Sequence, residues 1–302
     1  MGAAAGAGGT GKHRAALTSV FAAVGLTAFK IVVGLRTGSL GILAEAAHSG
    51  LDLAAAFMTL FAVRISGKPA DADHLYGHGK VENLSALLET GLLLITCLWI
   101  IREALHRLTS GNLGVEVNAW SFIVIMTSIV VDASRSRVLG KAAKEHNSQA
   151  LEADALHFST DVWSSVVVML GLICVSLSGR LPALKYADSL AAILVAAVCL
   201  WVTFRLGIRA AQALLDTAPR GMDTQVARAA EAVPGVHNCH AVRIRTSGPQ
   251  TFIDVHVEVD GAQSLADAHA LTEAVEHAIQ AVVPGADVTV HPEPLAEPPG
   301  QR

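Results

Sequence analysis

Six long apolar stretches constrain this 302-residue chain more than any other feature. Each is close to the roughly 20 residues that a helix needs to cross a bilayer. Only 16% of the residues are charged, against about 25% in an ordinary soluble domain. The sequence therefore predicts an α-helical membrane protein with a disordered N-terminus (residues 1–14) and a six-helix transmembrane domain (residues 15–210). The expected spans are approximately 15–35, 39–63, 83–106, 115–135, 150–178 and 185–207.

The connections between these spans differ in positive charge, which predicts their orientation. Eleven Lys and Arg residues belong with the two chain ends on one side, and five lie on the other: Arg36, Arg102, Arg107, Arg180 and Lys185. Connections rich in Lys and Arg stay in the cytoplasm. We therefore expect a multi-pass protein of the cell (inner or plasma) membrane, embedded in the lipid bilayer with both termini cytoplasmic. The net charge of −4 gives no indication of nucleic-acid binding.

The character of the chain changes after Arg220, where polar residues begin to alternate with apolar ones. Residues 222–232 and 264–283 have helical patterns, and Ser264 is the expected N-cap of the second. Residues 236–245, 251–259 and 286–291 have the patterns of strands. The order αββαβ predicts a small cytoplasmic α+β, ferredoxin-like domain over residues 211–293. The tail, residues 294–302, is rich in proline, and we expect it to be disordered.

Two identical pairs, His48 with Asp52 and His157 with Asp161, lie inside the second and fifth apolar stretches. Residues four apart share a face of a helix, so each pair can direct a nitrogen and an oxygen at one point. A single pair could equally be a hydrogen-bonded structural pair. Two such pairs bring two carboxylates into the membrane, where a divalent cation would neutralise them. Together they form a tetrahedral set of two nitrogens and two oxygens, which suits Zn(II).

An acid precedes each histidine by three residues: Glu45 before His48, and Asp154 before His157. These acids could relay protons or accept hydrogen bonds from the imidazoles. A role in polar contacts between helices is equally consistent with their positions, and the sequence leaves both interpretations open.

Two further groups of histidines lie outside the spans. Asp71, His74 and His78 have ligand-type spacing in the second connection, although such a loop is often merely solvated. The soluble domain contains six histidines, of which His240 and His256 fall on neighbouring predicted strands. His291 and Glu293 end the last strand. So many histidines in a small domain favour metal binding over a role as ordinary surface residues. His277 is the exception, because its position fits a solvated helix face.

The chain resembles the cation diffusion facilitator family from about Arg14 to Glu293. The resemblance rests on Gly38-Ser-Leu-Gly-Ile-Leu-Ala-Glu-Ala-Ala-His48-Ser-Gly-Leu-Asp52, Tyr76-Gly-His-Gly-Lys80-Val-Glu82 and Asp154-Ala-Leu-His157-Phe-Ser-Thr-Asp161, with support from Leu214-Leu-Asp216 and Ala268-His269. It implies a homodimeric secondary active transporter, not an enzyme, that exports divalent metal from the cytoplasm in exchange for protons.

The resemblance also implies three groups of metal ligands. These are His48, Asp52, His157 and Asp161 for transport, Asp71, His74 and His78 in the loop, and His240, His256, His269 and His291 in the cytoplasmic domain. Glu293 stands where some members have Asp, which keeps the ligand type and leaves the geometry open. The family further implies that the soluble domain dimerises and responds to metal.

The chemistry of the ligands is compatible with exchange of metal for protons, because histidine must be neutral and aspartate ionised to bind a metal. Zn(II) is the expected substrate and a structural or regulatory ion, with Fe(II), Co(II), Cd(II) and Mn(II) as alternatives. One rival function is an intramembrane zinc hydrolase, but the chain has no His-Glu-x-x-His motif, and four protein ligands close a tetrahedral site. The other is a metal-sensing receptor that transports nothing.

Overall fold

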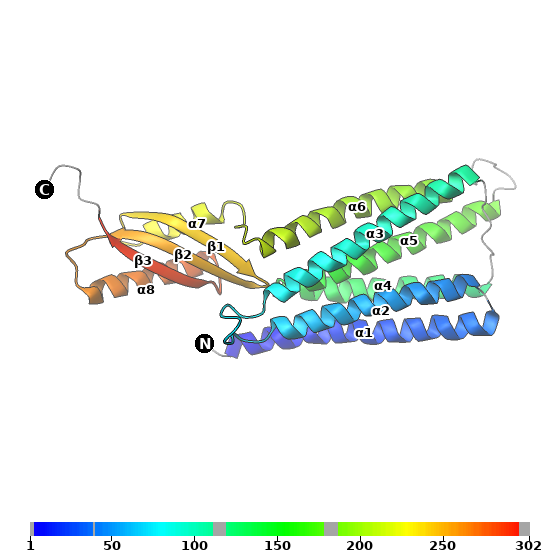
Figure 1. Cartoon of the computed structure of the whole chain (residues 1–302), viewed down its shortest axis with the longest axis horizontal. Helices are drawn as coiled ribbons and strands as arrows, with labels where there is room; N and C mark the ends of the chain where they lie inside the picture. The colour runs from blue at the N-terminus through cyan, green and yellow to red at the C-terminus, as the bar shows by residue number, and fades with distance from the viewer. Residues whose placement is uncertain (1–2, 39, 111–118, 178–186, 296–302) are drawn as a thin grey trace. The chain divides into compact units, whose positions relative to one another are not determined.

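A computed structural model of the protein describes residues 3–38, 40–110, 119–177 and 187–295. The chain divides into two compact units, Met1–Ala211 and Gln212–Arg302. Helices make up the first unit, and helices with a small sheet make up the second (Figure 1). The predicted architecture, a helical membrane domain followed by a small α+β domain, is confirmed.

The helices of the first unit run side by side (Figure 1). Among the described residues, four stretches are long and apolar enough to cross a membrane: Gly11–Thr37, Glu45–Ser66, Lys80–His106 and Ile193–Leu214. These belong to the first, second, third and sixth helices. The bounds are α1 (Ala3–Thr37), α2 (Leu40–Ser66), α3 (Lys80–Ser110), α4 (Ala119–His146), α5 (Gln149–Leu177) and α6 (Ala187–Leu214).

The helices extend further than the apolar stretches at two places. Helix α1 begins at Ala3, where we expected disorder over residues 1–14, and α4 continues to His146 through a segment expected to be a polar connection, residues 133–148. The α4 segment contains no proline, and its Ala, Leu, Arg and Lys residues favour helix. The helix ends where Asn147 adopts a left-handed conformation, with φ of 49°. Polarity marks where the apolar surface ends, but it does not stop a helix.

Apolar side chains cover the outside of this unit and polar ones lie within it. Phe21, Leu51 and Ile95 are each about two-thirds exposed or more. In contrast, Thr59, Glu89 and other polar side chains are buried. This distribution is typical of a protein surrounded by lipid, in which ionisable groups face the interior of the bundle.

A buried network joins four segments at one end of the bundle. The ammonium of Lys12 in α1 lies 2.5 Å from Oε1 of Glu82 in α3. Ser66, the last residue of α2, donates to the same oxygen at 2.6 Å. Ser148, which precedes α5, donates to Oε2. The carboxylate of Glu82 is therefore fully satisfied inside the protein, and it ties α1, α2 and the start of α5 to α3.

The second unit has the predicted order αββαβ. Its elements are α7 (Met222–Glu231), β1 (Asn238–Ser247), β2 (Gln250–Val259), α8 (Leu265–Val282) and β3 (Asp287–Pro294). The sheet has the order β1-β2-β3, with β2 antiparallel to β1 and parallel to β3. As predicted, Ser264 caps α8, and its hydroxyl accepts from the N–H of Asp267. The last predicted segment, the tail over residues 294–302, lies outside the described residues from 296 onward.

One face of this sheet packs against the two helices. Alternate residues of β2, including Ile253, Val255 and Val257, are fully buried with Val275 and Ile279 of α8. The intervening side chains of β2 point to the opposite face of the sheet. That face carries His256, and it determines which histidines can meet.

Candidate metal sites

The two His-Asp pairs of the membrane unit converge, one from α2 and one from α5. Nε2 of His157 lies 3.1 Å from Oδ1 of Asp52 and 3.5 Å from Oδ2 of Asp161. Nε2 of His48 lies 3.9 Å from the same Oδ1 of Asp52. Donor atoms of His48, Asp52 and Asp161 all lie within 4.8 Å of one another. The four side chains that the spacing singled out are therefore brought to one place, which is called the transport site below after the role that the resemblance implies for it.

The surroundings of the transport site suit a cation. Asp52 and His157 are buried, and Asp161 is nearly so, with its Oδ2 making no hydrogen bond in the described structure. The ring of His157 packs edge-on against Phe158 at 5.3 Å between centroids. Two nitrogens and two carboxylate oxygens in a confined space match the ligand set of Zn(II), with bonds of about 2.0–2.2 Å. The hydrogen bond between His157 and Asp52 would be replaced by bonds from each to the metal.

The flanking acids do not contact the imidazoles. Glu45 lies 3.2 Å from the ammonium of Lys30, which also donates to Ser49 at 2.7 Å. Asp154 is 1% exposed, and neither of its oxygens makes a hydrogen bond in the described structure. Of the two interpretations left open by the sequence, a contact between helices describes Glu45. Asp154 makes neither kind of hydrogen bond in the described structure.

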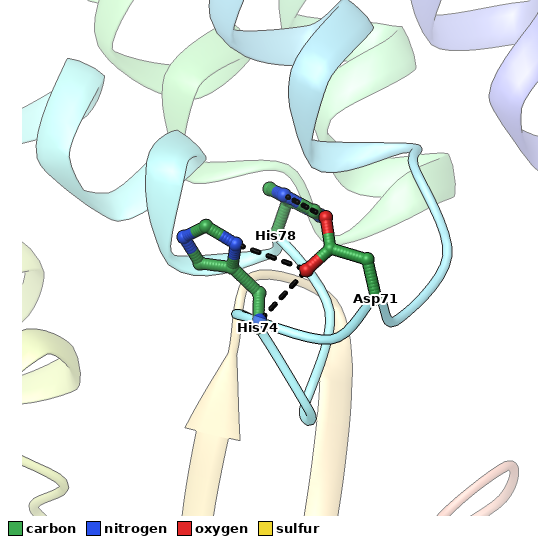
Figure 2. A group of neighbouring side chains, drawn as sticks. All are labelled: Asp71, His74 and His78. Atoms are coloured by element: carbon green, nitrogen blue, oxygen red, sulfur yellow. Dashed lines mark hydrogen bonds and ion pairs between the residues drawn. The ribbon is translucent and has the colours of Figure 1, made fainter.

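Asp71, His74 and His78 meet in the connection between α2 and α3 (Figure 2). Oδ1 of Asp71 lies 3.2 Å from Nδ1 of His74, and Oδ2 lies 3.3 Å from Nε2 of His78. The turn is closed by Gly77, whose φ of 73° is a left-handed conformation that glycine adopts without strain. The N–H of His74 donates to Asp71 at 2.7 Å, and this bond above all lowers the pKa of the Asp71 carboxyl. The loop thus holds an ionised carboxylate between two imidazoles.

Each strand of the soluble unit contributes one histidine to a single row across the sheet. His240 pairs with His256 in the antiparallel register, and His256 pairs with His291 in the parallel one. A bulge between His240 and Arg243 lies beside this row, with Ala241 at a φ of 51°. Ring centroids are 5.5 Å apart for the first pair and 4.7 Å for the second.

Glu293 completes this row from the end of β3. Its carboxylate lies 2.8 Å from Nδ1 of His256, 3.3 Å from Nε2 of His240 and 3.6 Å from Nε2 of His291. The hydrogen bond from His256 is the main reason why the pKa of Glu293 is lowered. The donors of His240, His256 and Glu293 lie within 4.8 Å of one another, which makes this, with the loop group, a second three-ligand group outside the membrane helices.

His269 lies elsewhere in the same unit. It is on α8, where its Nε2 lies 3.7 Å from Oε1 of Glu273. The helix packs on the apolar face of the sheet, whereas His256 points to the other face. Within one copy of the chain, the sheet therefore separates His269 from the other three histidines.

Other buried charges of the membrane unit were not assigned a role from the sequence. They include Lys30, Glu89, Asp132 and Arg135, all at most 7% exposed. Arg135 lies 3.3 Å from Asp132 and donates to Ser19 at 3.1 Å. Charged residues within an apolar stretch are the signal that marks such positions. The sequence shows that they exist, but some of their partners come from other helices, such as Ser19 of α1 for Arg135 and Ser49 of α2 for Lys30.

Two family models match the chain. The model described as the cation efflux transmembrane domain matches residues 16–215. The model described as the cytoplasmic domain of cation efflux proteins matches residues 219–295. The two matches cover both compact units, and the second identifies the α+β unit as a cytoplasmic domain.

Curated relatives are similar along nearly their whole length. The chain is 35% identical over 292 residues to the cation-efflux pump FieF of Pectobacterium atrosepticum, covering 95% of each chain. It is 34% identical over 295 residues to the FieF pump of Yersinia enterocolitica, covering 95% of this chain and 94% of the relative. A solved variant of the MamM CTD is 28% identical, with a TM-score of 0.24, and covers 24% of this chain and 92% of that one. On the family models and the curated relatives, the chain belongs to the cation diffusion facilitator family of divalent metal transporters.

Proposed function

We propose that this protein exports Zn(II) from the cytoplasm in exchange for protons. The observation that carries the proposal is the convergence of His48 and Asp52 with His157 and Asp161 inside the membrane unit. Ligands from two different helices meet at one point, so a change in the relative position of α2 and α5 alters the site. Such a change would open the site to one side of the membrane and then to the other.

The choice of zinc rests on the two imidazoles. Neutral nitrogen donors with two carboxylates suit a borderline ion that accepts tetrahedral geometry. Fe(II), Co(II), Cd(II) and Mn(II) are the alternative substrates, since affinity alone separates these ions poorly. Harder ions prefer more oxygen ligands, which makes Mn(II) the weakest of these alternatives.

The coupling to protons rests on the contact between His157 and Asp52. At 3.1 Å, a proton on Nε2 of His157 is shared with the carboxylate. Zn(II) can bind only when that proton has left. Loading of the metal therefore releases a proton, and unloading of the metal allows a proton to bind again. If loading faces the cytoplasm, an acidic exterior drives export.

The location of the transporter in the cell is also part of the proposal. We infer both termini on the cytoplasmic side of an inner or plasma membrane, from the excess of Lys and Arg in the connections on that side. We also infer a homodimer, supported by the match of the second unit to the family's cytoplasmic domain.

The two clusters outside the membrane are proposed as binding positions for the same metal. The loop group of Asp71, His74 and His78 would take up ions from the cytoplasm, and its first two residues are exposed. The sheet group of His240, His256 and Glu293, with His291 beside it, would act as a structural or regulatory site. His269 could join an ion at that row only from a second copy of the chain, because the sheet lies between them in one copy.

Zinc uptake by proteoliposomes under an imposed pH gradient tests the proposal. We expect Asp52→Ala or Asp161→Ala to reduce zinc flux to background, because each change removes one of two negative charges facing the dication. Glu145→Ala, which removes an exposed carboxylate at the end of α4, is the matched control and should transport normally. Zinc flux that ignores the gradient would rule out antiport. No flux in the parent protein would favour a metal sensor or an intramembrane hydrolase instead.

A further inference from the structure

Two buried carboxylates of the membrane unit belong neither to the transport site nor to the network around Glu82. They are Glu89 of α3 and Asp154 of α5, each 1% exposed. Oε1 of Glu89 accepts from the hydroxyl of Thr59, with Ser85 at 3.5 Å. Oε2 of Glu89 and both oxygens of Asp154 make no hydrogen bond in the described structure. Buried carboxylate oxygens without partners are costly, so a bound group that satisfies them would be stabilising.

Contacts between α2 and α3 show where Glu89 lies along the bundle. Ser66 of α2 contacts Glu82 of α3 at the end of the bundle. Thr59 lies seven residues before Ser66, and Glu89 lies seven residues after Glu82, about 10 Å along each helix. Asp52 of the transport site lies another seven residues along α2. Glu89 is therefore about midway between the end of the bundle and the transport site.

Distances along helix α5 place Asp154 at about the same height in the bundle as Glu89. Ser148 contacts the Glu82 network just before α5 begins. Asp154 follows Ser148 by six residues and precedes His157 by three, about 9 Å and about 4.5 Å along the helix. The two carboxylates interact electrostatically with each other, and each also interacts with His157.

One cation near Asp154 has its own partners. The guanidinium of Arg135 interacts electrostatically with Asp154, but its donors reach Asp132 and Ser19. Its face lies 3.4 Å from the centroid of the Phe158 ring. Arg135 therefore lies near Asp154 without occupying its oxygens. Those oxygens remain able to bind a cation.

We propose that Glu89 and Asp154 form a resting position for the transported divalent cation, between the Glu82 network and the transport site. This rests on the proposed function, since it lies on the same route. Carboxylates from two helices, with the hydroxyls of Thr59 and Ser85 nearby, offer only oxygen ligands. Such a position accepts a partly hydrated dication with little selectivity and holds it less tightly than two imidazoles with two carboxylates would hold zinc. The ion would move from there to His157, one helical turn away.

Metal binding to the full-length protein in detergent tests the proposal. His78→Ala, His240→Ala and Glu293→Ala disable the loop and sheet groups in a common background. Bound Zn(II) is counted by equilibrium dialysis at rising zinc concentration. We expect a tightly bound ion and a second, weaker one. Glu89→Gln combined with Asp154→Asn should lose only the weaker ion, whereas Asp52→Ala combined with Asp161→Ala should lose only the tighter one.

Two control variants separate cation binding from a structural role. Thr59→Val removes the hydrogen bond from Thr59 to Glu89 but leaves both carboxylates, and Glu89→Asp keeps the charge. Both should retain the weaker ion. In proteoliposomes, Glu89→Gln should raise KM for zinc by about tenfold and change kcat less, as expected from loss of binding on the route. If the Glu89→Gln variant fails to fold, Asp154→Asn alone is used in the dialysis and in the transport measurement.

Two results would overturn the proposal. One is an unchanged number of zinc ions after both carboxylates are replaced. The other is loss of the weaker ion in Thr59→Val together with the same fall in melting temperature as in Glu89→Gln. Neither result bears on the proposed function, which fails instead if Asp52→Ala and Asp161→Ala transport zinc normally.

Discussion

At the scale of single residues, the function depends on which donor atoms reach the metal. His48 is the more exposed of the two imidazoles at the transport site, with 38% of its side chain exposed against 9% for His157. It makes one long contact, 3.9 Å to Asp52, whereas His157 contacts both aspartates. His48 can therefore be replaced with the least disturbance to the packing.

His48→Asp should shift the preference of the transporter from Zn(II) towards the harder Mn(II), because an oxygen ligand replaces a nitrogen. We expect the ratio of Mn(II) to Zn(II) transport to rise by about tenfold. Competitive uptake in proteoliposomes measures it. His106→Asp, a change on α3 outside the three clusters, is the control. Unchanged relative rates across these metals would argue against His48 as a ligand.

Glu293 gives the soluble unit a dependence on acid. Its pKa is lowered from the ordinary value of 4.5, chiefly by the hydrogen bond from His256. The stabilisation from ionised Glu293 is therefore complete above pH 4.5 and is lost as the pH falls through the lowered pKa. The separately expressed unit should be more stable than its Glu293→Gln variant above pH 4.5, and this difference should vanish in stronger acid. Thermal unfolding in the presence of a chelator measures the stability of the parent unit and of the variant at each pH. A stability difference that does not change with pH would contradict the role given to Glu293.

At the scale of secondary-structure elements, the bundle is tied together where helices begin and end. Glu82 is the common partner of Lys12, Ser66 and Ser148. It joins α1, α2 and the start of α5 to α3 at the end of the bundle. Helices α2 and α5, which carry the transport site, are therefore held at this end through one carboxylate.

Glu82→Ala should destabilise the protein strongly, because it leaves the buried ammonium of Lys12 without its partner. Removing one member of a buried ion pair costs about 3–5 kcal/mol. Glu145→Ala breaks an exposed pair with Lys141, at 3.7 Å, and should cost less than about 1 kcal/mol. Thermal unfolding in detergent compares the two. Equal effects would show that the Glu82 network contributes no more than a surface pair.

At the scale of the whole molecule, the chain combines a membrane unit with a unit that has a core of its own. The core of the soluble unit is built from apolar residues of its helices and sheet, and includes none of its histidines. Metal binding and folding can therefore be separated in this unit. We therefore expect this unit to stay folded when a bound metal leaves.

The soluble unit expressed alone should be folded, dimeric and able to bind zinc. Replacing His240, His256, His269 and His291 together by alanine should leave it folded and dimeric but reduce zinc affinity by at least about a hundredfold. In the full-length protein, the same change should weaken activation of transport by zinc. Isothermal titration measures the first effect, with His277→Ala as the control. Equal affinity in the parent and the quadruple variant would show that these four are only surface residues.

Local patterns in the sequence determined much of this architecture. Apolar length predicted the membrane helices, and alternation with a capping Ser264 predicted the αββαβ order, because both depend on residues close together in the chain. The spacing of His48 and Asp52 likewise placed two donors on one helix face. The sequence did not predict the start of α1 or the end of α4. Polar residues mark where an apolar stretch ends, but a helix can continue through them.

Only the tertiary structure decided which distant groups meet. The approach of α2 to α5 brings His157 to Asp52, and no local pattern specifies a contact between residues so far apart in sequence. The same holds for Glu82, whose partners come from three other segments. In the soluble unit, strand register aligns His256 with His240 and His291, whereas the packing of α8 on the opposite face keeps His269 away. Local chemistry sets what each side chain can bind, and long-range packing sets which of them bind together.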